Sequence, residues 1–253
     1  NGIDIHVKYT GESMKNMDSV AFAHEQGQKE IANLLDSFIK DENKDTMQNE
    51  TSEILDYITE HFGPIHNTIS EIIPGSKVAV NIQIILPTKQ HNFTTLVTTG
   101  MSDIAMDETE ENVGTKFAEL IMKLPANWPV GKEDMMNNDY FWPIKWLRMI
   151  AHIPHSYDGW LDEGVILPNG EPPRPFSSNT ELSCILLKKS EDIGSFTYST
   201  KKSVDFFNLI PIFEEERSVA LQKGHELLLE EFDKHGISEV LDLNRKNIGL
   251  KHY

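Results

Sequence analysis

Cysteine is almost absent from this chain of 253 residues, and the scarcity limits how the fold is held together. Cys184 has no second cysteine with which to form an intramolecular disulfide, which suits a reducing compartment, so we expect a cytoplasmic protein. Long apolar runs are also missing, and no stretch approaches the ~18 residues of a membrane span. The first residues, NGIDIHVKYTG, have neither signal-peptide character nor an initiator Met, so we expect a processed or truncated start.

Basic residues are scarce relative to acidic ones. The chain has 23 Lys and Arg residues against 40 Asp and Glu residues, which gives a formal net charge of -17. Such a surface repels nucleic acids and anionic membranes and favours basic partners, so we expect neither nucleic-acid nor membrane binding. The length and the 39% of hydrophobic residues are sufficient for a substantial core.

The common catalytic motifs are missing as well. The sequence contains no G-x-S-x-G, P-loop or G-x-G-x-x-G pattern. Cys184 lies in the apolar run ELSCILL, where a thiol packs as a small hydrophobic group. The acidic residues between 103 and 111 lack the spacing of a calcium loop, which favours a solvated face. The residues alone therefore indicate no readable catalytic motif.

One alternative enzyme hypothesis rests on a pair of histidines. His152 and His155 form an H-x-x-H pattern, with Asp158 shortly after, and two imidazoles and a carboxylate are ligands for a metal-dependent hydrolase. Pro154 lies between the histidines and is expected to break the helix that would aim them together. The competing interpretation is two histidines at a helix end, where a cation meets the negative end of the dipole.

The first 62 residues are predicted to contain three helices, with a turn before them and a linker between the second and the third. Residues 1–40 resemble one ankyrin repeat, with a turn, a small-residue helix over 19–27, and a helix over 28–40 with an apolar stripe of Ile31, Leu34, Leu35 and Phe38. A lone repeat cannot bury its faces, so either further repeats precede it or the pair packs on the C-terminal part of the chain. The polar run 41–50 is predicted to be a linker, and 52–62 another helix.

From about residue 76 the apolar period changes to two. Val78, Val80, Ile82 and Ile84 share one face, and later segments up to about residue 210 also read as strands. A helix is expected to open at Pro143 and stop at Pro154, and another to cover 213–236. The pattern predicts an α/β (α+β) fold with one mixed sheet flanked by helices.

Four tryptophans fall within about thirty residues. Trp128, in KLPANWP, follows a predicted strand that Pro125 ends, and we expect it to be a buried core residue. Trp142, Tyr157 and Trp160 flank predicted turns and are interpreted as exposed anchors.

Seven segments in order resemble the suppressor-of-fused family over residues 75–249. They are PGSKVAVNIQIILP, LVTTGMSD, AELIMKLPANW, FWPIKWLRMIA, NTELSCILL, VDFFNLIPIFEEE and VLDLNRKN. The resemblance implies a domain over 51–253 with a mixed sheet flanked by helices, and neither a cofactor nor catalytic residues. Animal members bind a transcription-factor segment between two lobes, of which this chain resembles only the first. Bacterial members are generally viewed as immunity proteins that neutralise toxins.

Together these observations predict a protein-binding domain, with a bacterial immunity protein acting on a basic toxin as the specific hypothesis. The candidate binding surface combines the GMSD turn, the acidic loop after it and the aromatic anchors. Its residues are Gly100, Met101, Ser102, Asp103, Asp107, Glu108, Glu110, Glu111, Trp142, Tyr157 and Trp160.

Overall fold

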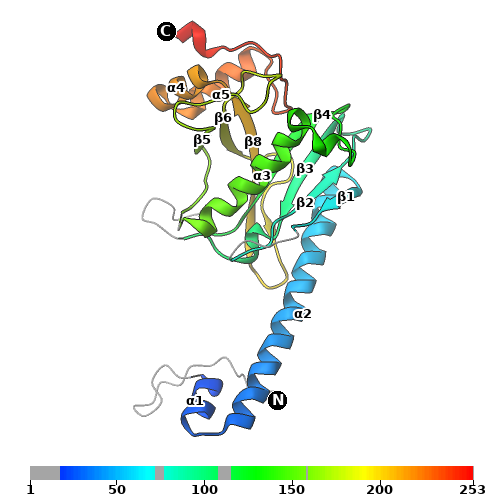
Figure 1. The fold of residues 1–253 in the computed structure, drawn as a ribbon, viewed down its shortest axis with the longest axis vertical. Coiled ribbons are helices and arrows are strands. Elements are labelled where there is room, and N and C mark those ends of the chain that lie inside the picture. The colour runs from blue at the N-terminus through cyan, green and yellow to red at the C-terminus, as the bar shows by residue number, and fades with distance from the viewer. Residues whose placement is uncertain (1–17, 72–76, 108–114, 158, 253) are drawn as a thin grey trace. The chain divides into compact units, whose positions relative to one another are not determined.

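The computed structural model describes residues 18–71, 77–107, 115–157 and 159–252 (Figure 1). The chain divides into two compact units, Asn1–Ser52 and Glu53–Tyr253. Two helices begin the described part, α1 (Ser19–Glu25) and α2 (Lys29–Phe62). The strands are β1 (Ile65–Ile69), β2 (Asn81–Ile85), β3 (Phe93–Thr99), β4 (Ala118–Pro125), β5 (Ile166–Pro168), β6 (Cys184–Lys189), β7 (Phe196–Thr197) and β8 (Ser203–Ile212). The later helices are α3 (Asn138–Ser156), α4 (Glu214–Lys223) and α5 (His225–Lys234), with short 3-10 turns η1 (Met101–Asp103), η2 (Asp134–Met136) and η3 (Gly249–His252).

In the smaller unit, α1 and the first part of α2 form a helix pair. The Asp18 side chain caps α1 by accepting from the Ala21 amide at 2.8 Å. The predicted apolar stripe is largely uncovered in this unit, since Ile31 is 51% and Leu34 56% exposed. The turn expected before the helices falls within residues 1–17, outside the described part. The structure thus places helices where the ankyrin-like pair was expected but leaves that assignment a prediction.

The polar run predicted as a linker is helical. Helix α2 continues through 41–50 without interruption and ends at Phe62. No glycine or proline occurs between Lys29 and Phe62, so polarity in this stretch signals exposure to solvent and not a break in the helix.

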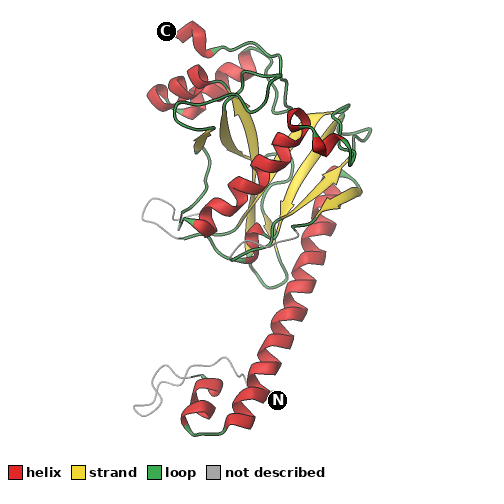
Figure 2. Ribbon diagram, viewed as in Figure 1, coloured by secondary structure: helices red, strands yellow, loops and turns green. Residues whose placement is uncertain are grey.

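An eight-stranded mixed sheet organises the larger unit (Figures 1 and 2). The strand order is β1-β2-β3-β4-β8-β6-β5, and β7 pairs with β8. The pairing of β4 with β8 is parallel, whereas the other pairs are antiparallel. This architecture confirms the predicted fold class. The edge strand β1 was missed, because its IHNTI sequence is polar and largely exposed.

Apolar side chains alternate between two buried faces of the sheet. One face carries residues such as Ile84, Leu96 and Leu120, and α3 packs against it with Leu147 and Ile150 (Figure 2). The four residues predicted to share a face, Val78, Val80, Ile82 and Ile84, all belong to this cluster. The period of two therefore identified the core face correctly.

The opposite face is covered by two groups of helices. The last turns of α2 contribute Ile58 and Phe62 to a cluster with Ile121 and Phe206. Further along the sheet, Cys184 packs with residues of α4 and α5. Cys184 is fully buried, as predicted from its apolar run, and burial raises the pKa of its thiol.

Helix α3 is longer at both ends than the sequence indicated. It begins at Asn138, after Asn137 has capped it by accepting from the Asp139 amide at 3.0 Å, and it runs through Pro154 to Ser156. Pro143 and Pro154 both lie inside the helix, so neither marks the boundary assigned to it. Pro154 sits in the last turn, where it removes one backbone bond but leaves the following residues helical.

The helix predicted over 213–236 is in fact two helices. Gly224 adopts φ 96° and ψ 147°, outside the helical region, and separates α4 from α5.

Trp128 is buried, as the sequence predicted. It is 8% exposed and belongs to the core cluster beneath α3, and its indole nitrogen donates to the Tyr140 carbonyl at 3.3 Å.

The residues after α5 are fixed by an ion pair in the interior. Arg245 makes a two-pronged contact with Glu216 of α4, at 2.6 Å for each nitrogen–oxygen pair. Its guanidinium also stacks over Phe213 and Phe232, at 4.8 and 5.0 Å from the ring centres. The tail is thereby held against α4 and α5.

None of the helices among the described residues has the length and apolar composition to cross a membrane.

Candidate functional site

The GMSD turn follows β3 and requires glycine at its first position. Gly100 has φ 98°, and a Cβ added there would lie 2.2 Å from the Ala79 carbonyl oxygen. Both the backbone conformation and the contact exclude a side chain. Met101 and Ser102 of the short turn η1 are each 1% exposed, so these two predicted binding residues are instead part of the interior.

A buried carboxylate holds this turn in place. Glu119 of β4 is fully buried, and it accepts from the Ser102 amide at 3.0 Å and the Ser102 hydroxyl at 2.7 Å. Its other oxygen accepts from the Thr98 hydroxyl at 2.6 Å. Burial raises the pKa of Glu119 to about 7, while the hydrogen bonds from Thr98 and Ser102 oppose that increase and the charge of Asp103 adds to it. The turn therefore rests on a group whose charge changes near neutral pH.

His155 attaches the end of α3 to the same turn. Its Nε2 donates to the Met101 carbonyl oxygen at 2.9 Å, and the side chain is 4% exposed. Burial lowers the pKa of His155, so the ring is held in its neutral form. The histidine is thus a structural link between α3 and η1.

His152 has a different partner from His155. Its Nε2 lies 2.9 Å from Glu71, whose carboxylate also accepts from the Val80 amide at 2.9 Å. Burial raises the pKa of Glu71, but these hydrogen bonds lower it by more, so the pKa is lowered on balance. Asp158 lies outside the described residues, and no group of three potential metal ligands exists within the part the structure describes. Within the described residues, the two histidines therefore have separate partners, and the hydrolase hypothesis gains no support.

The contact between His155 and the Met101 carbonyl brings the end of α3 to the GMSD turn, and some of the predicted binding residues at these two places are exposed. Asp103 and Asp107 are exposed, Ile104 is 42% exposed, and Tyr157, two residues after His155, is 80% exposed. We call Gly100, Asp103, Ile104, Asp107 and Tyr157 the turn surface. Glu108, Glu110 and Glu111 lie outside the described residues. The turn surface thus contains an exposed tyrosine and two exposed aspartates, next to the interior hydrogen bonds of Glu119 and His155.

The other two anchors do not belong to this patch. Trp142 is 3% exposed, and it precedes Tyr157 by fifteen positions, which separates the two by about 22 Å along the helix axis. Trp160 is partly buried and packs against the core cluster beneath α3. The interpretation of Trp142 as an exposed anchor was therefore wrong, because turn-flanking position alone does not reveal which side of a helix faces the core.

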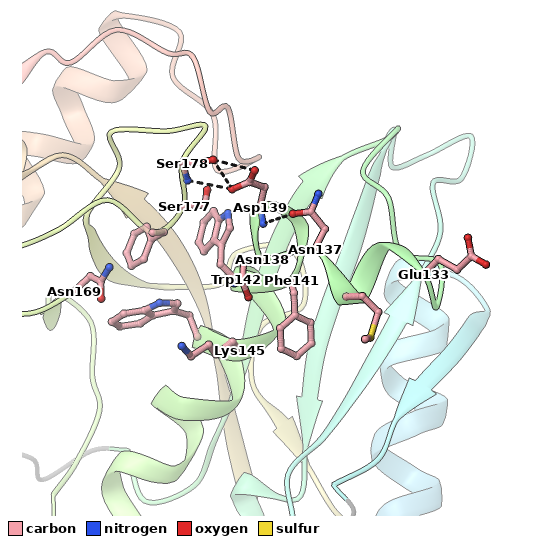
Figure 3. A pocket seen from close by; sticks show the side chains of 13 residues that line it. Glu133, Asn137, Asn138, Asp139, Phe141, Trp142, Lys145, Asn169, Ser177 and Ser178 are labelled. Atoms are coloured by element: carbon pink, nitrogen blue, oxygen red, sulfur yellow. Dashed lines mark hydrogen bonds between the residues drawn. The ribbon is translucent and has the colours of Figure 1, made fainter.

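Trp142 instead lines a cleft at the beginning of α3, which we call the α3 cleft (Figure 3). Its volume is about 890 Å³, and its other wall is the loop 169–178. Phe176 of that loop stacks on Trp142, with ring centres 4.8 Å apart and planes 8° apart, and meets the edge of Trp146 at 4.9 Å. The cleft thus has an aromatic floor.

Polar contacts join the two walls of the α3 cleft. Asp139 accepts from the Ser178 amide at 3.1 Å and from its hydroxyl at 2.9 Å (Figure 3). Asn169 holds the loop by donating to the carbonyls of Arg174 and Pro175. These bonds fix the shape of the cleft without any ligand.

Two of these features were missed at the sequence level, although each leaves a signal. Trp142 and Trp146 are four residues apart, a spacing that places them on one side of a helix. Glu119 is a lone carboxylate in the apolar run AELIM. A charge in a central strand points to a satisfied buried group.

Comparisons with known proteins agree with this fold. A sequence model described as "Suppressor of fused protein (SUFU)" matches residues 77–246. The structure is similar to "the Sufu-Fu complex crystal structure" (TM-score 0.57, 14% identity, covering 79% of this chain and 92% of that one). It is also similar to a SUFU homologue from Neisseria gonorrhoeae FA 1090 (0.55, 19%, 78% and 94%) and to Drosophila Suppressor of Fused (0.58, 14%, 81% and 52%). A search of curated proteins found no match.

Proposed function

This chain belongs to the suppressor of fused family, and from that premise we propose that it acts by binding another protein without catalysing a reaction. The observation that carries the proposal is the turn surface, where an exposed tyrosine and two carboxylates stand on a base fixed by Glu119 and His155. Exposed aromatic groups on a preorganised base are typical of binding hot spots. One solved structure similar to this chain is a complex of Sufu with Fu, which supports binding as a family property.

The more specific hypothesis is that the partner is a basic protein, such as a toxin that this chain neutralises. The net charge of -17 and the exposed Asp103 and Asp107 favour a positively charged partner and accelerate its association. The view of bacterial members of the family as immunity proteins is in line with this hypothesis. The ankyrin-like helix pair, with Ile31 and Leu34 exposed, is a second candidate contact region within the smaller unit.

The test is capture of a partner from the source cell by the full chain, followed by association rates over a salt series. The variant Asp103→Lys/Asp107→Lys should slow association and weaken its salt dependence, because steering acts over about 8 Å at physiological ionic strength. Tyr157→Ala should accelerate dissociation. Lys246→Ala, exposed on the C-terminal tail, is the control.

Each result bears on a separate part of the proposal. An acidic partner, or a rate that ignores both salt and charge reversal, would exclude the basic-partner hypothesis but not binding itself. Turnover of a small molecule with no protein captured would contradict the binding proposal as a whole.

A further inference from the structure

A groove beside α5 combines an apolar floor with carboxylates on its rim, and we call it the α5 groove. Its volume is about 420 Å³. Leu229 and Ile237, both half-buried, form the accessible part of the floor. Next to them Phe232 is buried in the cluster that joins α5 to β6 and β8 (Figure 1). The floor is therefore held in place by the core.

Three carboxylates follow one another along the α5 side of the rim. They belong to Glu226, Glu230 and Asp233, and all three residues are exposed. Among the described residues, no lysine or arginine forms a salt bridge with any of the three, since Lys234 pairs with Glu231. These negative charges are therefore not neutralised by the fold around them.

This arrangement opposes the stability of α5. Glu226 and Glu230 are four residues apart, and Glu230 and Asp233 are three apart, the spacings at which helical side chains are neighbours and like charges repel. Asp233 also lies in the last turn of α5, where the helix dipole disfavours a negative charge. Two departures from the local rules of helix stability at one place indicate a role other than folding.

The cations in the lining of the groove are already engaged. Lys188 lies 3.1 Å from Glu191 and 2.8 Å from Glu239. His225 lies 3.5 Å from the carboxylate of Glu226. The groove therefore carries an excess of negative charge, which favours a cationic occupant.

The spacing of the carboxylates restricts what that cation can be. The described part of the chain contains no group of three His, Cys, Asp or Glu side chains that could hold a metal ion. Between Glu226 and Asp233 the helix rises about 10 Å, so the rim matches an elongated ligand with several cationic groups. Lysine and arginine side chains provide such groups on apolar stems, and stems of this kind cover apolar surface while the charged end stays in water.

We infer that the α5 groove binds a basic segment of the partner protein, with the stems of lysine or arginine side chains on the apolar floor and their charged ends at Glu230 and Asp233. The inference rests on the proposed function in taking the ligand from a protein with a basic surface. It adds a contact region that shares no residue with the turn surface.

The experiment measures binding of dye-labelled peptides to the full chain by fluorescence anisotropy. The probes are capped hexalysine, capped hexaglutamate, and a capped hexamer of 2,4-diaminobutyrate, which keeps the positive charge on a shorter apolar stem. Hexalysine should bind and hexaglutamate should not. The diaminobutyrate peptide should bind more weakly than hexalysine, because its stems cover less of the floor.

A matched pair of double variants separates the groove from the charge of the whole chain. Glu230→Gln/Asp233→Asn removes two charges from the rim and should weaken hexalysine binding about fivefold, the effect of two surface ion pairs. Asp56→Asn/Glu60→Gln is the control, because it removes the same two kinds of charge from exposed positions on α2. It should change binding much less.

The melting temperature of the free chain separates binding from folding. Because the two carboxylates oppose α5, Glu230→Gln/Asp233→Asn should raise the melting temperature by about 1–2 °C while it weakens binding. A lower melting temperature together with weaker binding would overturn the inference, since the carboxylates would then support the fold.

Equal losses in the two double variants would also overturn it, because only the overall charge would then matter. Spermine that displaces hexalysine at a lower concentration than hexalysine itself needs for binding would reassign the groove to a polyamine. Hexalysine is independent of the natural partner, so failure of this titration leaves the turn surface and the proposed function intact. If no partner is captured while hexalysine binds as described, the proposed function fails and the groove remains a site for cationic peptides.

Discussion

The C-terminal tail and the GMSD turn each depend on a buried glutamate, but the two glutamates are satisfied in different ways. Glu216 and Glu119 are both fully buried. Glu216 faces the guanidinium of Arg245, whereas the donors to Glu119 among the described residues are the neutral groups of Ser102 and Thr98. The tail is therefore fixed by a pair of opposite charges. The turn is fixed by a single carboxylate, which can itself gain or lose a proton.

Because of this difference, the two contacts respond to different changes: the ion pair to the loss of one partner, and the single carboxylate to pH. A bidentate ion pair loses most of its value only when one partner is removed, because the other charge is then left buried. A carboxylate held by neutral donors loses or gains charge with pH, and the hydrogen bonds around it change strength accordingly. Since the turn surface is the proposed binding region and the tail is not, the adjustable arrangement occurs where binding is proposed.

The largest expected effect comes from breaking the ion pair. Arg245→Ala should lower the free energy of unfolding by ~3–5 kcal/mol, because it leaves Glu216 without its cation and removes the stacking on Phe213 and Phe232. Denaturant unfolding measures this, with Lys246→Ala as a control expected to change stability by no more than ~0.5 kcal/mol. The double variant Arg245→Met/Glu216→Met should recover part of the loss, and no recovery would show that packing, not charge, dominates.

The turn can be broken through its backbone. Gly100→Ala should cost about 3 kcal/mol, from the strain of a left-handed conformation and from displacement of the Ala79 carbonyl. Gly194→Ala is the matched control, since Gly194 also has positive φ but nothing lies within 4 Å of its added Cβ. It should cost only ~1–2 kcal/mol. Equal losses in the two variants would mean that the close contact at Ala79 relaxes freely.

The pH dependence of stability should expose Glu119. Because its pKa rises from 4.5 to about 7 on folding, the folded state binds more protons between these values. The contribution of this residue to stability is present below pH 4.5 and is lost as the pH rises through 7, by up to about 3 kcal/mol. Glu119→Gln should remove this slope, so the difference between wild-type and variant unfolding curves isolates it from other titrating groups. A difference that does not change between pH 4.5 and 8 would contradict the shift.

The sequence predicted those features of the fold that follow from the periodicity of apolar residues. The alternation of apolar residues at Val78, Val80, Ile82 and Ile84 predicted which side chains face the core. It did not reveal Glu119 as the support of the turn, because hydrogen bonds between β4 and η1 join residues that no local pattern connects. Nor did it find the α3 cleft, whose second wall is a loop far along the chain.

Proline and glycine explain several of the differences in element boundaries. Pro154 was expected to end α3, yet it lies in the last turn, where few backbone bonds remain to be lost. Gly224 was expected to continue a helix, yet its positive φ divides it. Polar composition at 41–50 was taken as a break, although it contains neither residue. Tertiary packing and local sterics, not composition, set these boundaries.

The smallest expected effect tests whether the bond between the turn and Glu119 is charge-assisted. Ser102→Ala removes the hydroxyl that donates to Glu119 at 2.7 Å but keeps the backbone amide bond. At pH 5, where Glu119 is protonated, the loss should be about 1 kcal/mol, as for a neutral hydrogen bond. At pH 8 the acceptor is a carboxylate, and the loss should rise to about 2 kcal/mol.

Ser177→Ala is the matched control, because its hydroxyl donates to the neutral amide oxygen of Asn179 at 2.6 Å. Its effect should be small and the same at both pH values. By linkage, the pKa of Glu119 should also rise in Ser102→Ala, since a bond that favours the ionised form has been removed. A loss of equal size at pH 5 and pH 8 would show that Glu119 keeps one charge state across this range, and the contrast with the tail would then rest on geometry alone.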